Sequence, residues 1–246
     1  MSVKITYSNK TNKSSTNTVL FTNDKFKIDN LQNHISKSEF FYIKDLIKNS
    51  DSKKNMFVYE INSKKNLVLI SIKNNLKPID FERLGAEFFE RINYGKNSEY
   101  LINADTVPVK IENFLNYFLH RLKLKSYEFY KYKTKKETRN ITINVSGRKN
   151  KFSSKSYLKF KALEEGVFYA RDLVSEPGNV LHPDEYAKRL NSLKKLGLKI
   201  DIFNEKKLKK LGMYSLLGVG MGSIRGSYLV TIEWKGIKNK SKPLAF

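Results

Sequence analysis

The chain has 246 residues and a formal net charge of +23, and hydrophobic residues make up 40% of it. This length suffices for one large domain or two modest ones, and this apolar content excludes global disorder. The sequence has no cysteine, which excludes disulfides, thiolate metal sites and a cysteine nucleophile.

The first part of the chain predicts alternating strands and helices. Runs rich in β-branched and aromatic residues indicate strands at 4–7, 18–21, 56–61, 67–72, 100–102 and 139–146. The polar segment 62–66 is expected to be the turn of a hairpin. A helix is expected to open at Pro78, with Asp80 as its N-cap, because apolar residues recur at helical spacing from Phe81 to Ile92.

A second amphipathic helix is expected over 111–122. The basic, serine-bearing stretch 147–156 is poor in apolar residues, so we place a domain boundary near it. A helix of roughly 157–173 is expected to follow and to bridge the two parts of the chain.

The rest of the chain contains clearer signals for where helices and strands begin and end. Glu176–Asn179 is expected to form a turn, and Pro183 suits the first position of a helix that Gly197 ends. Further elements are expected as a strand over 198–202, a helix over 205–211 capped by Asn204, and a strand over 228–234. Alternation of strands and helices predicts an α/β fold.

Candidate chemistry is sparse. Of the three histidines, His34 has no metal-ligand spacing, His120 is expected on a helix surface, and His182 is expected in a loop or as a cap. Glu164 and Glu165 are interpreted as a solvated charged face. The glycine-rich stretch 217–223 precedes a strand and not a helix, so a structural turn or close packing is expected there, and not a phosphate loop.

The positive charge has two interpretations. Clustered cations neutralise phosphates and would favour a nucleic-acid partner. The lysines are instead scattered along the chain and greatly outnumber the arginines. This favours a general bias in composition over a specific anionic partner. No apolar run approaches the ~18 residues of a membrane span, and the start lacks a signal-peptide core. A soluble, cytoplasmic protein without a membrane partner is therefore expected.

The stretch Ala170–Pro183 has the pattern A-R-D-L-x-x-x-P-x-N-x-x-x-P. It resembles the opening of the catalytic domain of the leucyl aminopeptidase family, also called the cytosol aminopeptidases (peptidase family M17). Further similar segments are 129–135, 209–213, 218–223 and 233–236. The resemblance implies a macro-like N-terminal α/β domain over 1–150, a linker and bridging helix over 151–175, and a truncated start of the catalytic domain over 176–246.

The resemblance also implies a chemistry that these residues do not carry. The family holds two divalent metals, Mn or Zn, with residues of a V-G-K-G-x-T-F-D-x-G-G segment and an N-T-D-A-E-G-R segment. Neither segment occurs here, so no catalytic, cofactor-binding or metal-binding residue is assigned. The chain alone is expected to be inactive, with an open apolar edge at Tyr228–Trp234 and reduced stability beyond about residue 176.

Three kinds of partner stay open at this point. The chain resembles one part of a split aminopeptidase whose catalytic half, and hence peptide substrate, is supplied separately. Assembly into a homo-oligomer, a hexamer in the family, is the second. The third is non-specific nucleic acid, bound by a basic module derived from the N-terminal domain.

Overall fold

The computed structural model describes residues 2–8, 17–48, 54–73, 75–93, 97–108, 113–134, 140–147, 154–236 and 242–245. The chain divides into two compact units, Met1–Arg171 and Asp172–Phe246, and each is described by itself. The division into 1–150, 151–175 and 176–246 stays a prediction.

Within the described part of the first unit, six strands form one sheet in the order β1-β6-β5-β2-β4-β3. All neighbouring strands run parallel except the pair β3 and β4, which form the expected antiparallel hairpin. The strands are β1 (Ser2–Ser8), β2 (Asn17–Asn23), β3 (Met56–Asn62), β4 (Lys65–Ile72), β5 (Asn97–Asn103) and β6 (Asn140–Ser146). The predicted α/β class is confirmed.

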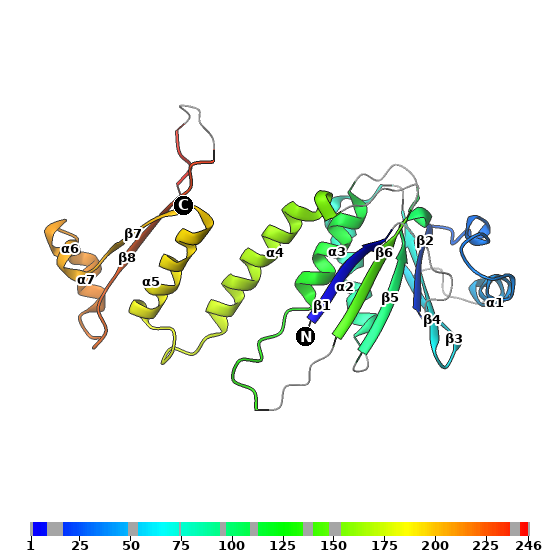
Figure 1. Cartoon of the computed structure of the whole chain (residues 1–246), viewed down its shortest axis with the longest axis horizontal. Coiled ribbons are helices and arrows are strands. Elements are labelled where there is room, and N and C mark those ends of the chain that lie inside the picture. Colours follow the sequence, from blue (N-terminus) through cyan, green and yellow to red (C-terminus); the bar gives the residue numbers. More distant parts are fainter. Residues whose placement is uncertain are drawn as a thin grey trace. The chain divides into compact units, whose positions relative to one another are not determined.

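Helices cover both faces of this sheet (Figure 1). On one face lie α2 (Pro78–Ile92) and α3 (Phe114–Lys125). Their aromatic side chains pack on β2, and the Phe118 ring lies 5.7 Å from Phe21 and 5.5 Å from Phe88, centroid to centroid. The residues at helical spacing that predicted α2 are all buried: Phe81, Leu84, Phe88 and Ile92. Residues 109–112 lie outside the described part, so the predicted start of α3 at 111 is not tested.

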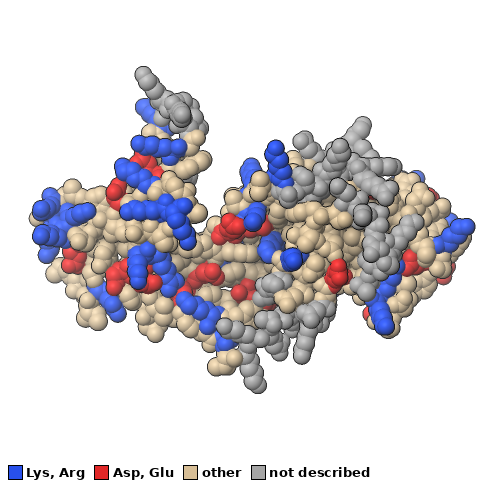
Figure 2. All heavy atoms as spheres, in the orientation of Figure 1, with Lys and Arg blue, Asp and Glu red and all other residues tan. Residues whose placement is uncertain are grey.

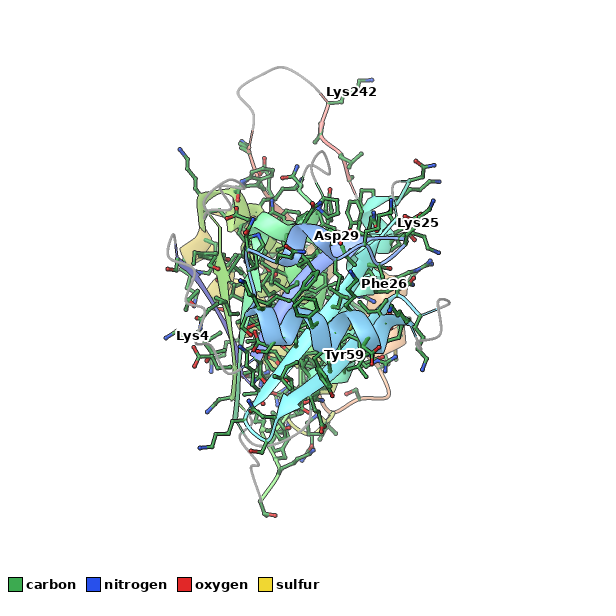
Figure 3. All side chains as sticks on the ribbon, turned by 90° about the vertical axis from the view of Figure 1, so that its right-hand side faces the viewer. Lys4, Lys25, Phe26, Asp29, Tyr59 and Lys242 are labelled. Carbon is green, nitrogen blue, oxygen red and sulfur yellow. The ribbon has the colours of Figure 1, made fainter. Side chains whose placement is uncertain are left out.

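The other face of the sheet is covered by α1 (Lys37–Lys48), which has no counterpart among the predicted elements (Figures 1 and 3). Phe40 and Ile43 of α1 pack in a second core with Leu20 and Leu69. Tyr59, labelled in Figure 3, belongs to the same core. Successive residues of β2 thus serve opposite cores, as the pleat of a strand requires.

The start of α2 differs in one detail from the prediction. Lys77 is the N-cap residue, and Asp80 lies at the third helical position. The Asp80 carboxylate accepts a hydrogen bond from the Lys77 backbone amide at 2.9 Å. The expectation that Asp80 is the N-cap was wrong by three residues, because Pro78 takes the first helical position.

The bridging helix is α4 (Ser154–Ser175), three residues longer at its start than the predicted 157–173. Its first-unit portion packs on α3. The Phe160 ring lies 5.1 Å from Tyr117, and the Arg171 guanidinium donates a hydrogen bond to the Leu124 carbonyl at 2.6 Å.

The second unit follows its local sequence signals. Its helices are α5 (Pro183–Asn191), α6 (Glu205–Lys210) and α7 (Tyr214–Gly220), with a 3-10 turn at Ser192–Leu196. Its strands β7 (Lys199–Phe203) and β8 (Leu229–Glu233) pair antiparallel. Gly197 and Gly212 adopt positive φ angles of 86° and 70° where helical segments end. Glycine is favoured at such positions because it has no Cβ to clash in the left-handed region. Within the described residues, no helix is both long enough and apolar enough to cross a bilayer.

Candidate functional site

The first unit holds a buried polar cluster where α3, α4 and β1 meet. We call it the Glu164 cluster; its members are Tyr7, His120, Lys123, Tyr157 and Glu164. Glu164 is 4% exposed, and its Oε1 lies 3.0 Å from His120 Nδ1. The Tyr157 hydroxyl donates a hydrogen bond to the same oxygen. A buried carboxylate thus has two hydrogen-bond partners, as a group removed from water requires.

Burial shapes the protonation of the other cluster members. Burial raises the pKa of Tyr7 to about 12, and the negative charge of Glu164 adds to this. Burial and the hydrogen bond to Glu164 also raise the pKa of Tyr157. The pKa of Lys123 is lowered by burial, although the charge of Glu164 opposes this. The Lys123 ammonium donates to the Val3 carbonyl of β1. The arrangement ties α4 and α3 to the first strand.

Two predictions fail at this cluster. His120 was expected on a helix surface and is 8% exposed, and Glu164 was expected to be solvated. Both are buried because α4 packs across α3, which the sequence of neither helix shows alone. A usable signal was present: Tyr157, Phe160 and Glu164 share one helical face, which aromatic residues mark as inward. Glu165 is exposed, as predicted.

The remaining histidines have structural roles. His34 Nδ1 lies 2.9 Å from the Asn103 side-chain nitrogen. His182 is the N-cap residue of α5, and its Nδ1 accepts a hydrogen bond from the Glu185 amide at 3.4 Å. The prediction that His182 is a cap is confirmed.

The glycine-rich stretch is partly helical. A turn was expected over 217–223, but α7 extends to Gly220. The helix begins at Tyr214, before the glycines, so its N-terminus does not follow them as a phosphate loop requires. Close packing is confirmed at Gly220, where an added Cβ would lie 2.0 Å from the Ser227 hydroxyl oxygen.

The second unit contains a largely apolar cleft of about 500 Å³ between α5 and β8. Its lining includes Leu181, Tyr186, Leu190, Tyr228 and Val230. This volume is of the size that binds small molecules or side chains. His182 contributes an imidazole to the lining of the cleft, and none of the described lining residues is an Asp or a Glu.

An ion-pair group in the second unit is centred on Arg189, in the last turn of α5. The Arg189 guanidinium lies 2.9 Å from Glu176 Oε1 and 3.0 Å from Glu185 Oε1. The hydrogen bond to Glu176 raises the pKa of Arg189, and the hydrogen bond from Arg189 lowers the pKa of Glu185. This group links the turn after α4 to α5.

The described residues do not fit a two-metal centre. Among them, no group of three or more His, Asp or Glu side chains is placed to hold a metal ion. Oxygen-rich metal sites require several converging carboxylates. The metal chemistry that the resemblance implies is therefore not built from this part of the chain.

Comparison with known proteins identifies the relatives of the chain. Residues 168–246 match the family model "Cytosol aminopeptidase family, catalytic domain". A probable cytosol aminopeptidase of Brucella ovis is 45% identical over 131 residues, covering 50% of this chain and 26% of that protein. A second, from Brucella anthropi, is 34% identical over 174 residues, covering 68% of this chain and 35% of that protein.

Solved structures share the fold. A tomato leucine aminopeptidase mutant superposes with a TM-score of 0.72 at 14% identity, over 94% of this chain and 50% of that one. The bottromycin maturation enzyme BotP, in complex with Mn, gives a TM-score of 0.65 at 13% identity, over 90% and 46%. The chain spans 26% to 35% of the length of the two curated relatives above. Residues 168–246 thus match the catalytic domain of the cytosol aminopeptidase family, and the chain is similar to members of that family over the parts that these comparisons cover.

Proposed function

We propose that this chain supplies the N-terminal domain and the opening of the catalytic domain of a metal-dependent aminopeptidase, which releases N-terminal amino acids from peptides. The observation that carries the proposal is the match of residues 168–246 to the family's catalytic domain. The 94% coverage of this chain by the tomato leucine aminopeptidase fold supports it.

In this proposal the chemistry belongs to residues outside the 246. Two divalent metals, Mn or Zn, would polarise the peptide carbonyl and supply a hydroxide nucleophile. This chain's own contribution is structural: α5, its His182 cap and the Arg189 ion pairs hold the apolar cleft beside β8. By itself the chain is expected to give no turnover, and a separate catalytic half would complete it.

The test is a complementation assay with a leucine-amide substrate and Mn²⁺. The purified chain alone is expected to be inactive. Addition of a polypeptide carrying the catalytic residues of the Brucella ovis relative beyond the matched region is expected to produce turnover that a chelator abolishes. A chain ending at Arg171 is the matched control, since it retains the first unit and lacks the second. It is expected not to complement.

Two outcomes would contradict the proposal. Chelator-sensitive turnover by the chain alone would show that it carries its own metal site. Equal turnover with the Arg171 control would show that the second unit contributes nothing to the catalytic domain. Size determination of the same samples would show whether the chain forms a homo-oligomer, a hexamer in the family, as we also propose. A cytoplasmic location is proposed because the matched relatives are named cytosol aminopeptidases.

A second candidate function follows from one surface. Four exposed lysines of α6 gather at one end of the second unit, where Figure 2 shows a positive patch: Lys206, Lys207, Lys209 and Lys210. Such a patch would bind nucleic acid without sequence preference and lose affinity steeply with salt. Replacing all four lysines by glutamine should weaken a gel shift at low salt. A shift that persists unchanged in the variant or at high salt would rule out this charge effect.

A further inference from the structure

The first unit contains a cleft lined by residues outside the Glu164 cluster. It has a volume of about 330 Å³ and lies between the end of β4 and the first turns of α2. This size is at the lower end of small-molecule sites, about 300 to 1,000 Å³. The location, outside the carboxyl end of a parallel strand, is where open α/β sheets bind ligands.

The wall formed by α2 carries charges of alternating sign. Asp80, Arg83 and Glu87 line the cleft at positions i, i+3 and i+7 of the helix, which places them on one face. Successive charges are therefore separated by about 4.5 to 6 Å along the helix axis. Lys73, just after β4, brings a second positive charge, and Leu76 adds apolar surface.

The lining of the cleft also includes a hydroxyl side chain, that of Ser71. Ser71 is 3% exposed, and its backbone amide donates a hydrogen bond to the Asn55 carbonyl at 2.8 Å. Among the hydrogen bonds of the described residues, none involves the Ser71 hydroxyl. Because Ser71 lines the cleft, its hydroxyl can form a hydrogen bond with a polar ligand atom there.

These charges select against a simple anion. The Asp80 carboxylate already accepts from the Lys77 amide, and it lies 3.5 Å from the Arg83 guanidinium. A phosphate placed at the start of α2 would meet this carboxylate. Two cations and two anions in the lining instead match a ligand that carries one charge of each sign.

We propose that this cleft binds a free α-amino acid with an apolar side chain. The ligand carboxylate would meet Arg83, Lys73 and the Ser71 hydroxyl. Its ammonium group would meet Asp80 or Glu87, and its side chain would pack on Leu76 and Leu84. The inference does not rest on the proposed peptidase role, although free amino acids are what that reaction would release.

The experiment is a calorimetric titration of the full chain with L-leucine. Saturable binding is expected, and two analogues act as matched probes: leucinamide lacks the carboxylate, and N-acetyl-leucine lacks the ammonium group. Because each loses a charge-assisted contact, each is expected to bind about tenfold more weakly or worse. Arg83→Gln should weaken L-leucine to a similar extent, and Ser71→Ala should weaken it less.

Arg121→Gln is the control variant, since Arg121 is an exposed arginine of α3 outside the lining of this cleft. It should leave leucine binding unchanged. Thermal melting of each variant would separate loss of binding from loss of folding. The proposal is overturned if L-leucine gives no saturable heat, if both analogues bind as well as leucine, or if folded Arg83→Gln and Ser71→Ala bind like the parent chain.

Discussion

The two units of this chain are stabilised in different ways. The first unit has two apolar cores, one on each face of its sheet. In the described part of the second unit, the buried apolar residues are Ala187, Ile200 and Leu208. Large side chains there are instead open to solvent: Val219 is 89% exposed, and Ile224 is fully exposed.

This difference shows which kind of sequence information builds each unit. The first unit depends on contacts between residues far apart in sequence, such as those of Phe118 with Phe21 and Phe88. The second unit follows local signals, namely the His182 and Asn204 caps and the glycines that end its helices.

The largest expected effect is loss of a core side chain of the first unit. Phe118→Ala removes a fully buried ring and should destabilise that unit by about 3 to 5 kcal/mol. Leu208→Ala, at a fully buried position of the second unit, should leave the first unit unchanged. Hydrogen exchange of β2, β4 and β6 would measure this. Equal loss of protection in those strands in both variants would show that the units unfold as one.

The same contrast explains what the sequence could predict. Strong periodicity located α2 and β6, and the alternating Ile141, Ile143 and Val145 are all buried. The helix α1 was missed because the run Phe40 to Ile43 is apolar on every side, and Phe41 is 67% exposed in the structure. Periodicity fails where an exposed aromatic residue hides it.

The candidate site was less predictable than the fold. His182 as a cap followed from its neighbours in sequence, whereas the contact of His120 with Glu164 joins residues 44 positions apart. The helical face shared with Tyr157 and Phe160 indicates that Glu164 points inward, but it does not show that α3 is the helix that Glu164 meets. The charged residues around the β4–α2 cleft likewise come together only when the strand end and the helix face converge.

The second-largest expected effect is loss of the Glu164 carboxylate, compared with loss of the adjacent Glu165 carboxylate. Glu164→Ala leaves His120 and Tyr157 without their shared acceptor, and it should cost the first unit about 3 kcal/mol. Glu165→Ala, one residue later and exposed, should change the free energy of unfolding by less than about 0.5 kcal/mol. Urea unfolding followed by circular dichroism would measure both. Similar costs for the two variants would contradict the description of Glu164 as a buried, bonded carboxylate.

The third effect concerns the close contact of α2 with α3. A Cβ on Gly85 would lie 2.0 Å from the Phe118 backbone carbonyl oxygen, so Gly85→Ala should force the helices apart and cost about 1 to 3 kcal/mol. Gly166 of α4 has nothing within 4 Å of the same added atom, and Gly166→Ala should stabilise the helix by about 0.5 to 1 kcal/mol. Opposite shifts in melting temperature are therefore expected. Shifts of the same sign would show that the helix contact is looser than described.

The fourth effect is a dependence on alkaline pH that belongs to the first unit. The pKa of Tyr7 is raised to about 12 from its usual 10.0. The folded state therefore keeps this proton longer than the unfolded state, and the resulting stability is present below pH 10 and lost as the pH rises to about 12. The lowered pKa of Lys123 acts in the opposite sense, since its loss of a proton relieves a buried charge. Tyr7→Phe should flatten the alkaline decline in melting temperature, and an unchanged decline would assign it to other groups.

The smallest effect should be confined to the second unit. The Asn204 side chain accepts a hydrogen bond from the Lys207 amide at 3.2 Å and caps α6. Asn204→Ala should cost about 1 kcal/mol, whereas Asn204→Asp should keep the cap. Because the second unit has few buried apolar residues, this loss should speed hydrogen exchange across α6 and in β7, while the first unit stays protected. If exchange rises in α6 alone, β7 and β8 are held independently of the cap, and the second unit is less dependent on local signals than its sequence suggests.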